Sequence, residues 1–298
     1  MLGLVMKLIT IGNLRSLISR EHPKMTPLSI DEVMNAYHDV STLYPFAPSM
    51  SIWRAWELAA YRRYKLPGPI LDLGCGDGQY FKLVWPSIKD VVGIDIDSSI
   101  IDSAVASGVY TSVLETSAAN MSIADSSFNS VFANCSLEHM DDLDSVLANV
   151  RRVLRPNGAF LLSVVTDKFL EWVTLADIAS LLDGPARGSS IINHYSSYHH
   201  LVTALPPERW VSRIESAGFN VLEHTPIMPE LVSRLDLFVD CLWHQPDTGK
   251  EFGAKLHESF KSIPHFPEVL GDIVKALLVA EKSATVGSGA VFYAKRKS

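Results

Sequence analysis

The sequence is organised around one glycine-rich turn that follows a short apolar run. Residues 70–80 read Ile-Leu-Asp-Leu-Gly-Cys-Gly-Asp-Gly-Gln-Tyr. The first four residues predict a short buried strand of a parallel sheet, and glycines then stand at every second position. Glycine tolerates positive φ angles and has no Cβ to collide with a bound molecule, while Asp77 is suited to cap the helix that follows. The pattern therefore predicts a small-molecule site at the carboxyl end of a strand.

The spacing of the glycines separates two kinds of ligand. A dinucleotide-binding turn has the spacing G-x-G-x-x-G, which directs a helix N-terminus at a pyrophosphate. Here the spacing is G-x-G-x-G, and Asp72 precedes the first glycine by two residues. A carboxylate at this point would repel a pyrophosphate but attract a ligand that carries an ammonium and a sulfonium group. The turn therefore favours S-adenosylmethionine over NAD.

With this turn, the sequence resembles the class I S-adenosylmethionine-dependent methyltransferases, in particular the small-molecule group similar to ubiquinone and menaquinone methyltransferases. The resemblance spans roughly residues 71–165 and the last strand. Residues 91–97 are similar to the family's second strand with its terminal acid, residues 117–129 to its adenine-binding stretch, and residues 131–140 to its fourth strand. The resemblance implies a Rossmann-like α/β fold with a seven-stranded, mostly parallel sheet whose last strand is antiparallel.

The resemblance also implies which residues bind the cofactor. Asp95 matches the acid that binds both ribose hydroxyls, and Ile96 is then expected to pack on the adenine. Ser117 stands where the family usually has an Asp that accepts from the adenine amine, so backbone groups of Ala118 and Ala119 are expected to contribute more. The predicted set for S-adenosylmethionine, which leaves as S-adenosylhomocysteine, is Asp72, Gly74, Cys75, Gly76, Gly78, Asp95, Ile96, Ser117, Ala118, Ala119 and Asn134.

Histidines supply most of the candidate catalytic groups. If the acceptor is a hydroxyl, methyl transfer needs a base with a pKa near ambient pH, and histidine is the usual one. His139 lies just past the predicted fourth strand, where a structural or cofactor-orienting role also remains open. The other candidates come from an aromatic, histidine-rich segment, and no sequence argument ranks the full set of His139, His194, His199, His200 and Tyr195.

Acidic residues at 141–144 resemble a magnesium-binding group at first sight. Acids in the first turn of a helix are more simply partners of the helix dipole, so no metal site is predicted. The net charge is −7, and no basic run occurs beyond residues 295–297, so no nucleic-acid partner is predicted. Cys75, Cys135 and Cys241 are odd in number and widely spaced, which favours the reducing cytoplasm over a disulfide framework.

The chain length of 298 residues predicts one core domain with substantial insertions. The expected strands are residues 70–73, 91–95, 110–114, 130–134, 159–165, 219–225 and 289–295. The expected regions are an N-terminal helical lid or oligomerisation region at 1–66, a cofactor-binding core at 67–165, 206–225 and 288–298, and acceptor-binding insertions at 166–205 and 226–287.

Two segments of the chain carry further predictions. Apolar residues within 1–18 fall near helical spacing, which favours an amphipathic helix docked on this domain or on a second copy of the chain over attachment to a membrane surface. Gly184, Pro185 and Gly188, with adjoining serines, predict a mobile loop within the first insertion.

The favoured function is methyl transfer to oxygen, nitrogen or carbon of a small, largely apolar or aromatic metabolite, as in natural-product biosynthesis. Oxygen is the commonest of the three target atoms. Methylation of a sugar or a lipid-linked glycan is the alternative, although it would demand more acids and amides in the insertions. A non-catalytic protein that binds S-adenosylmethionine is a third hypothesis, against which the intact Asp72, Asp95 and glycines argue.

Overall fold

The structure is a computed structural model that describes residues 22–247 and 250–298. The predicted helix within residues 1–18, and its contact with another subunit or a membrane, lie outside the described residues. Within the described part of the chain, no helix is both long enough and apolar enough to cross a membrane.

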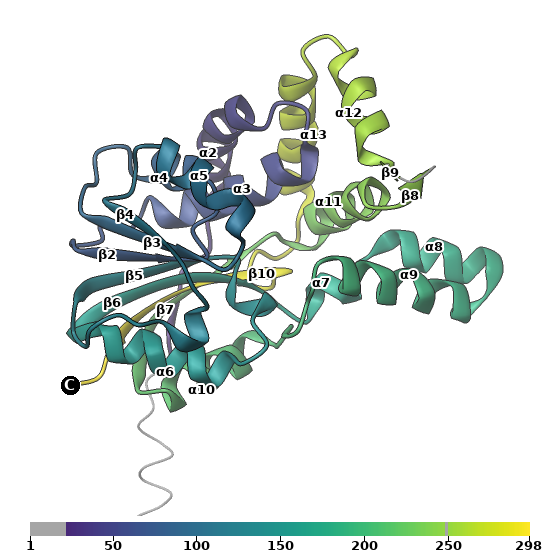
Figure 1. Cartoon of the computed structure of the whole chain (residues 1–298). Coiled ribbons are helices and arrows are strands. Elements are labelled where there is room, and N and C mark those ends of the chain that lie inside the picture. Colours follow the sequence, from purple (N-terminus) through teal and green to yellow (C-terminus); the bar gives the residue numbers. More distant parts are fainter. Residues whose placement is uncertain (1–21, 248–249) are drawn as a thin grey trace, which may run out of the picture.

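One twisted sheet forms the centre of the molecule (Figure 1). Its strand order is β1-β7-β10-β6-β5-β2-β3-β4. All neighbouring pairs are parallel except those of β10, which runs antiparallel to both β6 and β7. The strands are β1 (Lys24–Met25), β2 (Ile70–Leu73), β3 (Val91–Asp95), β4 (Ser112–Glu115), β5 (Phe128–Asn134), β6 (Leu154–Val165), β7 (Phe219–Ile227) and β10 (Gly289–Arg296). The predicted Rossmann-like α/β fold with an antiparallel last strand is confirmed, and β1 adds an eighth, two-residue strand at one edge.

Helices cover both faces of this sheet (Figure 1). One face carries α2 (Ile30–Leu43), α3 (Pro48–Tyr61), α4 (Gln79–Val84) and α5 (Ser98–Ala106), and the other carries α6 (Leu143–Val153) and α10 (Pro207–Ser216). Because side chains alternate along a strand, neighbouring residues enter different cores. Ile70 packs with the first group of helices, whereas Leu71 packs with the second. The apolar strand runs are therefore buried on both sides.

The two insertions are helical. The first forms α7 (Lys168–Glu171), α8 (Thr174–Asp183) and α9 (Pro185–Tyr198), and the second forms α11 (Glu230–Trp243), the hairpin β8 (Pro246–Asp247) and β9 (Lys250–Glu251), α12 (Gly253–Lys261) and α13 (Phe266–Ala280). In Figure 1, α8 and α9 project from the sheet beside α11. α7 directly follows the carboxyl end of β6, so the first insertion starts next to the sheet edge where the predicted site lies.

Two sequence predictions need correction. The expected mobile loop at 184–188 is the junction of two helices, because Gly184 ends α8 with φ 88° and Pro185 is the first residue of α9. The expected strand at 110–114 begins only at Ser112, because Tyr110 turns its hydroxyl to Asp72 instead of joining the ladder.

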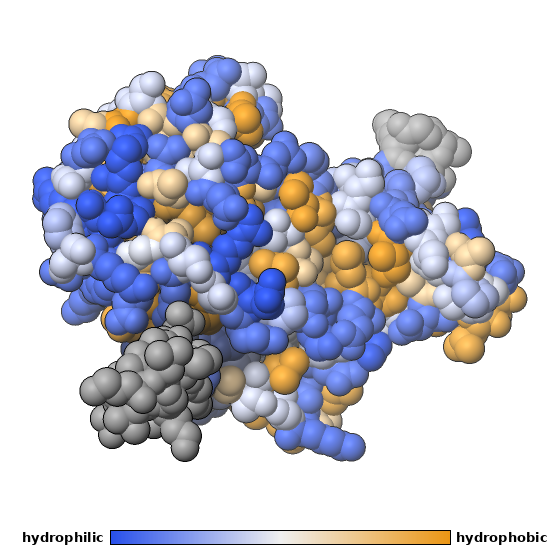
Figure 2. Space-filling model, turned by 90° about the horizontal axis from the view of Figure 1, so that it is seen from below, coloured by the Kyte–Doolittle hydropathy of each residue, from blue (hydrophilic) through white to orange (hydrophobic). Residues whose placement is uncertain are grey.

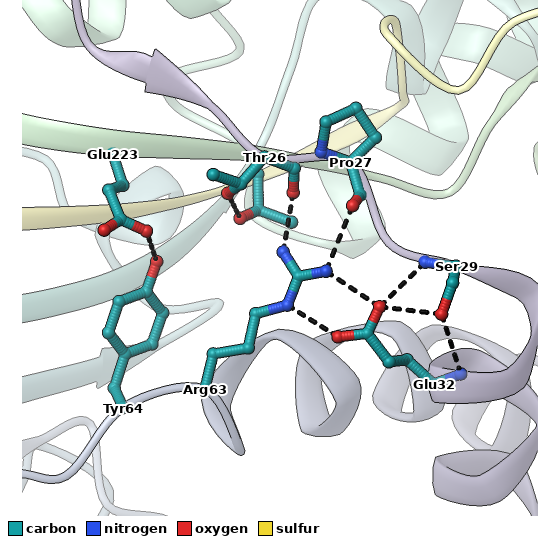
Figure 3. A network of polar contacts seen from close by, with 8 residues as sticks. Thr26, Pro27, Ser29, Glu32, Arg63, Tyr64 and Glu223 are labelled. Carbon is teal, nitrogen blue, oxygen red and sulfur yellow. Dashed lines mark hydrogen bonds and ion pairs between the residues drawn. The ribbon is translucent and has the colours of Figure 1, made fainter.

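A network around Arg63 fixes the N-terminal segment onto α2 and α3 (Figure 3). Its guanidinium donates to both carboxylate oxygens of Glu32, at 2.7 and 2.8 Å, and to the carbonyl oxygens of Thr26 and Pro27, at 2.8 and 3.0 Å. Glu32 also accepts from Ser29 N, which completes a capping box at the start of α2. One arginine therefore joins a strand edge, a helix start and a helix end.

Candidate functional site

The glycine-rich turn joins β2 to α4 with three positive φ angles. They are 76° at Gly74, 53° at Gly76 and 75° at Gly78. A Cβ at Gly78 would lie 2.7 Å from the Tyr110 ring, whereas a Cβ at Gly76 would meet nothing within 4 Å. Gly76 therefore leaves bare backbone open to the site. Asp77 does not occupy the N-cap, which is Gly78, but its side chain accepts from Gln79 N at 2.9 Å.

A cavity of about 580 Å³ opens against this turn. That volume lies within the range of about 300–1,000 Å³ that is typical of small-molecule sites. All eleven residues predicted to bind the cofactor line it, namely Asp72, Gly74, Cys75, Gly76, Gly78, Asp95, Ile96, Ser117, Ala118, Ala119 and Asn134. The carboxyl ends of β2, β3 and β5 meet here, as expected for a ligand site of a parallel sheet.

Two carboxylates stand at the strand ends of this cavity. Asp72 is only 2% exposed, and burial raises its pKa to about 7, an effect that the Tyr110 hydrogen bond opposes and nearby Asp95 strengthens. Tyr110 Oη donates to Asp72 at 2.7 Å. Asp95 accepts from Gly76 N at 3.1 Å and from Asp97 N at 3.0 Å. A cationic ligand would therefore stabilise the ionised form of Asp72, while backbone donors hold Asp95 in place.

The far wall of the cavity suits a flat, partly apolar group. The side chain of Ile96 is 73% exposed although it is large and apolar. Ser117 begins the short 3₁₀ turn η1 (Ala118–Asn120), and its Oγ accepts from Ala119 N at 3.3 Å. The residues therefore fit S-adenosylmethionine, since the carboxylates, the open backbone at Gly76 and the exposed apolar Ile96 match its charged and planar parts.

Sequence reasoning missed a buried ion pair whose arginine, Arg54, lines both this cavity and a second one. Glu57 is fully buried, and its Oε2 lies 2.6 Å from Arg54 Nη1. Its Oε1 accepts from Trp53 Nε1 at 3.1 Å and from Ser163 Oγ at 2.7 Å. The amide of Asn134 also lies 3.2 Å from Glu57 Oε2. Only the tertiary fold brings α3 to β5 and β6, so no sequence signal of local spacing could have indicated this pair.

The second cavity has a volume of about 170 Å³ and shares Arg54, Cys135 and His139 with the first. Its other walls come mainly from aromatic and apolar side chains and from two acids: Ser49, Met50, Trp53, Val165, Phe169, His199, Leu201, Asp236 and Asp240. Apolar residues also gather at the surface between the body of the molecule and its projecting helices (Figure 2). The two cavities therefore adjoin each other at these three shared residues.

The candidate catalytic residues fall into three places. His139 lines both cavities, and within the described part of the chain its buried Nδ1 has no hydrogen-bond partner. His200 lines the first cavity and His199 the second. His194 and Tyr195 line neither, because His194 points to the carbonyl of His244, at 3.4 Å, and the fully buried Tyr195 donates to Asp240 at 2.5 Å.

Comparison with known proteins agrees with this geometry. Residues 71–162 match the family described as Methyltransferase domain. The chain is 24% identical over 196 residues to a malonyl-[acyl-carrier protein] O-methyltransferase of Yersinia pestis, covering 62% of this chain and 72% of that one. It is 24% identical over 223 residues to the ubiquinone/menaquinone biosynthesis C-methyltransferase of Haemophilus ducreyi, covering 67% and 85%.

A solved structure, that of the [4+2]-cyclase SpnF, shares the fold with a TM-score of 0.52 at 19% identity, covering 93% of this chain and 99% of that one. This likeness concerns the fold alone. The fold, the glycine turn and the family match agree with the class I methyltransferases. The chain carries an S-adenosylmethionine-dependent methyltransferase domain at residues 71–162, and its methyl donor is S-adenosylmethionine.

Proposed function

We propose that this methyltransferase acts on a small, largely apolar or aromatic metabolite, with a hydroxyl oxygen as the favoured target. The observation that carries the proposal is the pair of adjoining cavities that share Arg54, Cys135 and His139. The larger one contains the predicted cofactor residues. The smaller one has walls of Trp53, Phe169 and other apolar side chains, which suit an aromatic acceptor better than a sugar. Such acceptors are typical of natural-product biosynthesis in the reducing cytoplasm.

The proposed roles in cofactor binding follow the geometry of the larger cavity. Asp95 binds the ribose hydroxyls, Ile96 packs on the adenine, and Ser117 with its neighbouring backbone contacts the adenine amine. Asp72 interacts with the ammonium group through its charge. Gly76 lets the ligand approach the backbone because it has no side chain. Bound in this way, S-adenosylmethionine supplies an activated methyl group on a positively charged sulfur.

The chain itself contributes alignment, water exclusion and a proton acceptor. In-line methyl transfer requires the acceptor atom about 3 Å from the methyl carbon, so most of the rate comes from positioning. His139 is the proposed base for a hydroxyl acceptor, because it lines both cavities and its Nδ1 has no hydrogen-bond partner among the described residues. Of the other candidates, His199 already contacts Asp240 at 3.2 Å, and His194 and Tyr195 line neither cavity.

The N-terminal region and the two insertions each contribute residues to the smaller cavity, where the acceptor is proposed to bind. Residues 1–66 supply Met50 and Trp53, residues 166–205 supply Phe169 and His199, and residues 226–287 supply Asp236 and Asp240. This distribution supports the assignment of the two insertions to acceptor binding. It also supports a covering role for the N-terminal helices α2 and α3, since a closed site keeps water away from the reacting atoms.

Calorimetry with S-adenosylhomocysteine tests the assignment of the larger cavity. We expect the Asp95→Ala variant to bind roughly 10- to 100-fold more weakly, because hydrogen bonds to a charged group contribute about 1.5–3 kcal/mol. Asp177→Ala is the matched control, since this acid lies on α8 and pairs with Arg234 at 3.4 Å, away from both cavities. Equal affinity of both variants for S-adenosylhomocysteine would contradict the assignment.

Mass spectrometry of reactions with phenols, quinols, indoles and simple glycosides tests the acceptor class. Methylation of the glycosides alone would overturn the proposal of an apolar or aromatic acceptor.

A further inference from the structure

Three side chains from the two insertions converge at the edge of the smaller cavity. Asp240 lies in the last turn of α11, His244 directly follows the end of that helix, and His199 directly follows the end of α9. His199 Nε2 lies 3.2 Å from Asp240 Oδ2, and His244 Nε2 lies 3.6 Å from Asp240 Oδ1. One donor atom from each of the three residues lies within 4.8 Å of the others. Two imidazole nitrogens therefore face one carboxylate.

We propose that His199, Asp240 and His244 bind a divalent transition-metal ion such as Zn²⁺. Tetrahedral zinc with bonds of about 2.0–2.1 Å to nitrogen and oxygen separates its ligand atoms by roughly 3.3 Å. The distance of 3.2 Å between His199 Nε2 and Asp240 Oδ2 matches this separation, and one ligand atom from each of the three residues lies within 4.8 Å of the others. His244 Nε2 lies 3.6 Å from the other carboxylate oxygen, beyond the range of an N–H···O hydrogen bond, so hydrogen bonding alone does not account for the position of His244.

The surrounding side chains hold the three ligands in place. Metal-binding groups typically have outer partners that fix their orientation. Tyr195 Oη donates to Asp240 Oδ2 at 2.5 Å, and His244 Nδ1 lies 3.4 Å from Glu251 Oε2. The ring of Tyr198 stacks on His244 with centroids 4.0 Å apart. Asp240 and His244 thus each have an outer partner in addition to the other proposed ligands.

Three protein ligands leave a coordination position open, as in catalytic zinc sites. His199 and Asp240 both line the smaller cavity, so this position opens toward the acceptor site. If the proposed function holds, the open position specifies the acceptor further. The acceptor is then a molecule with an oxygen donor, such as a phenolate or an enolate, at the end remote from the methyl-accepting atom. The metal site itself does not depend on that function.

Titration of tag-free, chelator-treated full-length protein with Co²⁺ and Zn²⁺ tests the site. We expect one ion per chain and the visible absorption of four-coordinate cobalt without sulfur ligands. His199→Ala and His244→Ala are expected to lower the affinity by roughly 100-fold or more, since even outer partners contribute 10- to 100-fold. His194→Ala is the matched control on α9, because its imidazole contacts only the His244 carbonyl, at 3.4 Å, and it is expected to bind metal like the wild type.

Other outcomes would overturn the proposal. The described residues contain a second group with metal-binding side chains, Cys135, Glu138 and His139. Thiolate-to-cobalt absorption that disappears in Cys135→Ser would assign the ion to that group instead. If neither Co²⁺ nor Zn²⁺ binds at micromolar concentration, both groups of side chains are excluded as metal sites. X-ray absorption of the zinc-loaded wild type counts its imidazole ligands without any variant, and fewer than two would contradict the site. Calorimetry with S-adenosylhomocysteine separately reports whether the methyl-donor site is intact.

Discussion

Asp72 is a carboxyl group whose charge depends on its surroundings at the end of β2. Burial raises its pKa to about 7, against the opposing hydrogen bond from Tyr110. Below that pH the free protein carries a neutral Asp72, which cannot attract an ammonium group. We therefore expect the dissociation constant of S-adenosylhomocysteine to rise as pH falls below about 7, by up to tenfold per pH unit. Calorimetry between about pH 5.5 and 8.5 measures this dependence.

The Asp72→Asn variant is the control for that dependence. It keeps the shape and the Tyr110 contact but cannot ionise, so its affinity is expected to be lower and nearly independent of pH. The same slope in the variant as in the wild type would show that another group titrates. Tyr110→Phe is expected to move the wild-type curve to higher pH, because the lost hydrogen bond no longer favours the carboxylate.

At the residue scale, the eleven residues proposed to bind the cofactor all line the larger cavity, but the sequence did not indicate what surrounds them. The glycine spacing and the strand-terminal Asp95 are local signals, because the turn conformation and the strand ends follow from neighbouring residues. Tyr110 is 38 residues away from Asp72, and Arg54 and Glu57 reach the site from a helix before the sheet. Such contacts depend on how elements that are distant in the sequence pack together. The local pattern of apolar and polar residues carries no information about that packing.

At the scale of elements, strands and helices with strong periodicity were predicted more reliably than the junctions between them. Gly184 and Pro185 were interpreted as a loop, yet they join α8 to α9 without a long connection. A Cβ at Gly188 would lie 1.9 Å from Ser180 Oγ, so this glycine allows the two helices to pack closely. Glycine and proline mark a break in a helix, but the sequence alone does not tell a loop from a tight helical hairpin.

The Arg63 network makes α2 and α3 depend on each other. The Arg63 hydrogen bond lowers the pKa of Glu32 to about 2, although burial opposes this shift. In the unfolded chain Glu32 titrates near 4.5, so its contribution to stability is present above that pH and is lost as pH falls from about 4.5 to about 2. Because the Glu32 side chain is 38% exposed, solvent screening limits this contribution to about 1 kcal/mol.

We expect Arg63→Ala to lower the free energy of unfolding by about 1–2 kcal/mol near neutral pH, since two backbone carbonyls also lose their donor. The loss is expected to be smaller at about pH 3, where Glu32 is partly protonated in the unfolded chain and the ion pair contributes less. Urea denaturation at both pH values measures it. Arg63→Lys is expected to restore only part of the loss, because an ammonium group cannot form the same fork of hydrogen bonds. A loss independent of pH would contradict the role of Glu32.

At the scale of the whole molecule, the sheet is buried on both faces, and it carries a histidine that is costly to protonate. His224 on β7 stacks on Phe292 of β10, with ring centroids 5.0 Å apart. Its buried Nε2 has no hydrogen-bond partner among the described residues, and burial lowers its pKa to about 4, although Glu208 opposes the shift. Protonation would place a buried charge without a hydrogen-bond partner against the neighbouring strands β7 and β10, so it favours unfolding of the sheet as a unit.

Because of His224, the free energy of unfolding is therefore expected to decrease as the pH is lowered. In the unfolded chain this histidine takes up a proton near pH 6.5, whereas in the folded chain it does so only near pH 4. Its contribution is fully present above about 6.5, and the wild type is expected to lose about 2–3 kcal/mol of unfolding free energy by about pH 4.5. His224→Phe keeps an aromatic ring against Phe292 and should remove most of this loss. His38→Phe, on the exposed side of α2, is expected to keep the wild-type profile. Urea denaturation of the three proteins between about pH 7.5 and 4.5 decides the matter, since parallel curves for all of them would assign the dependence to other groups.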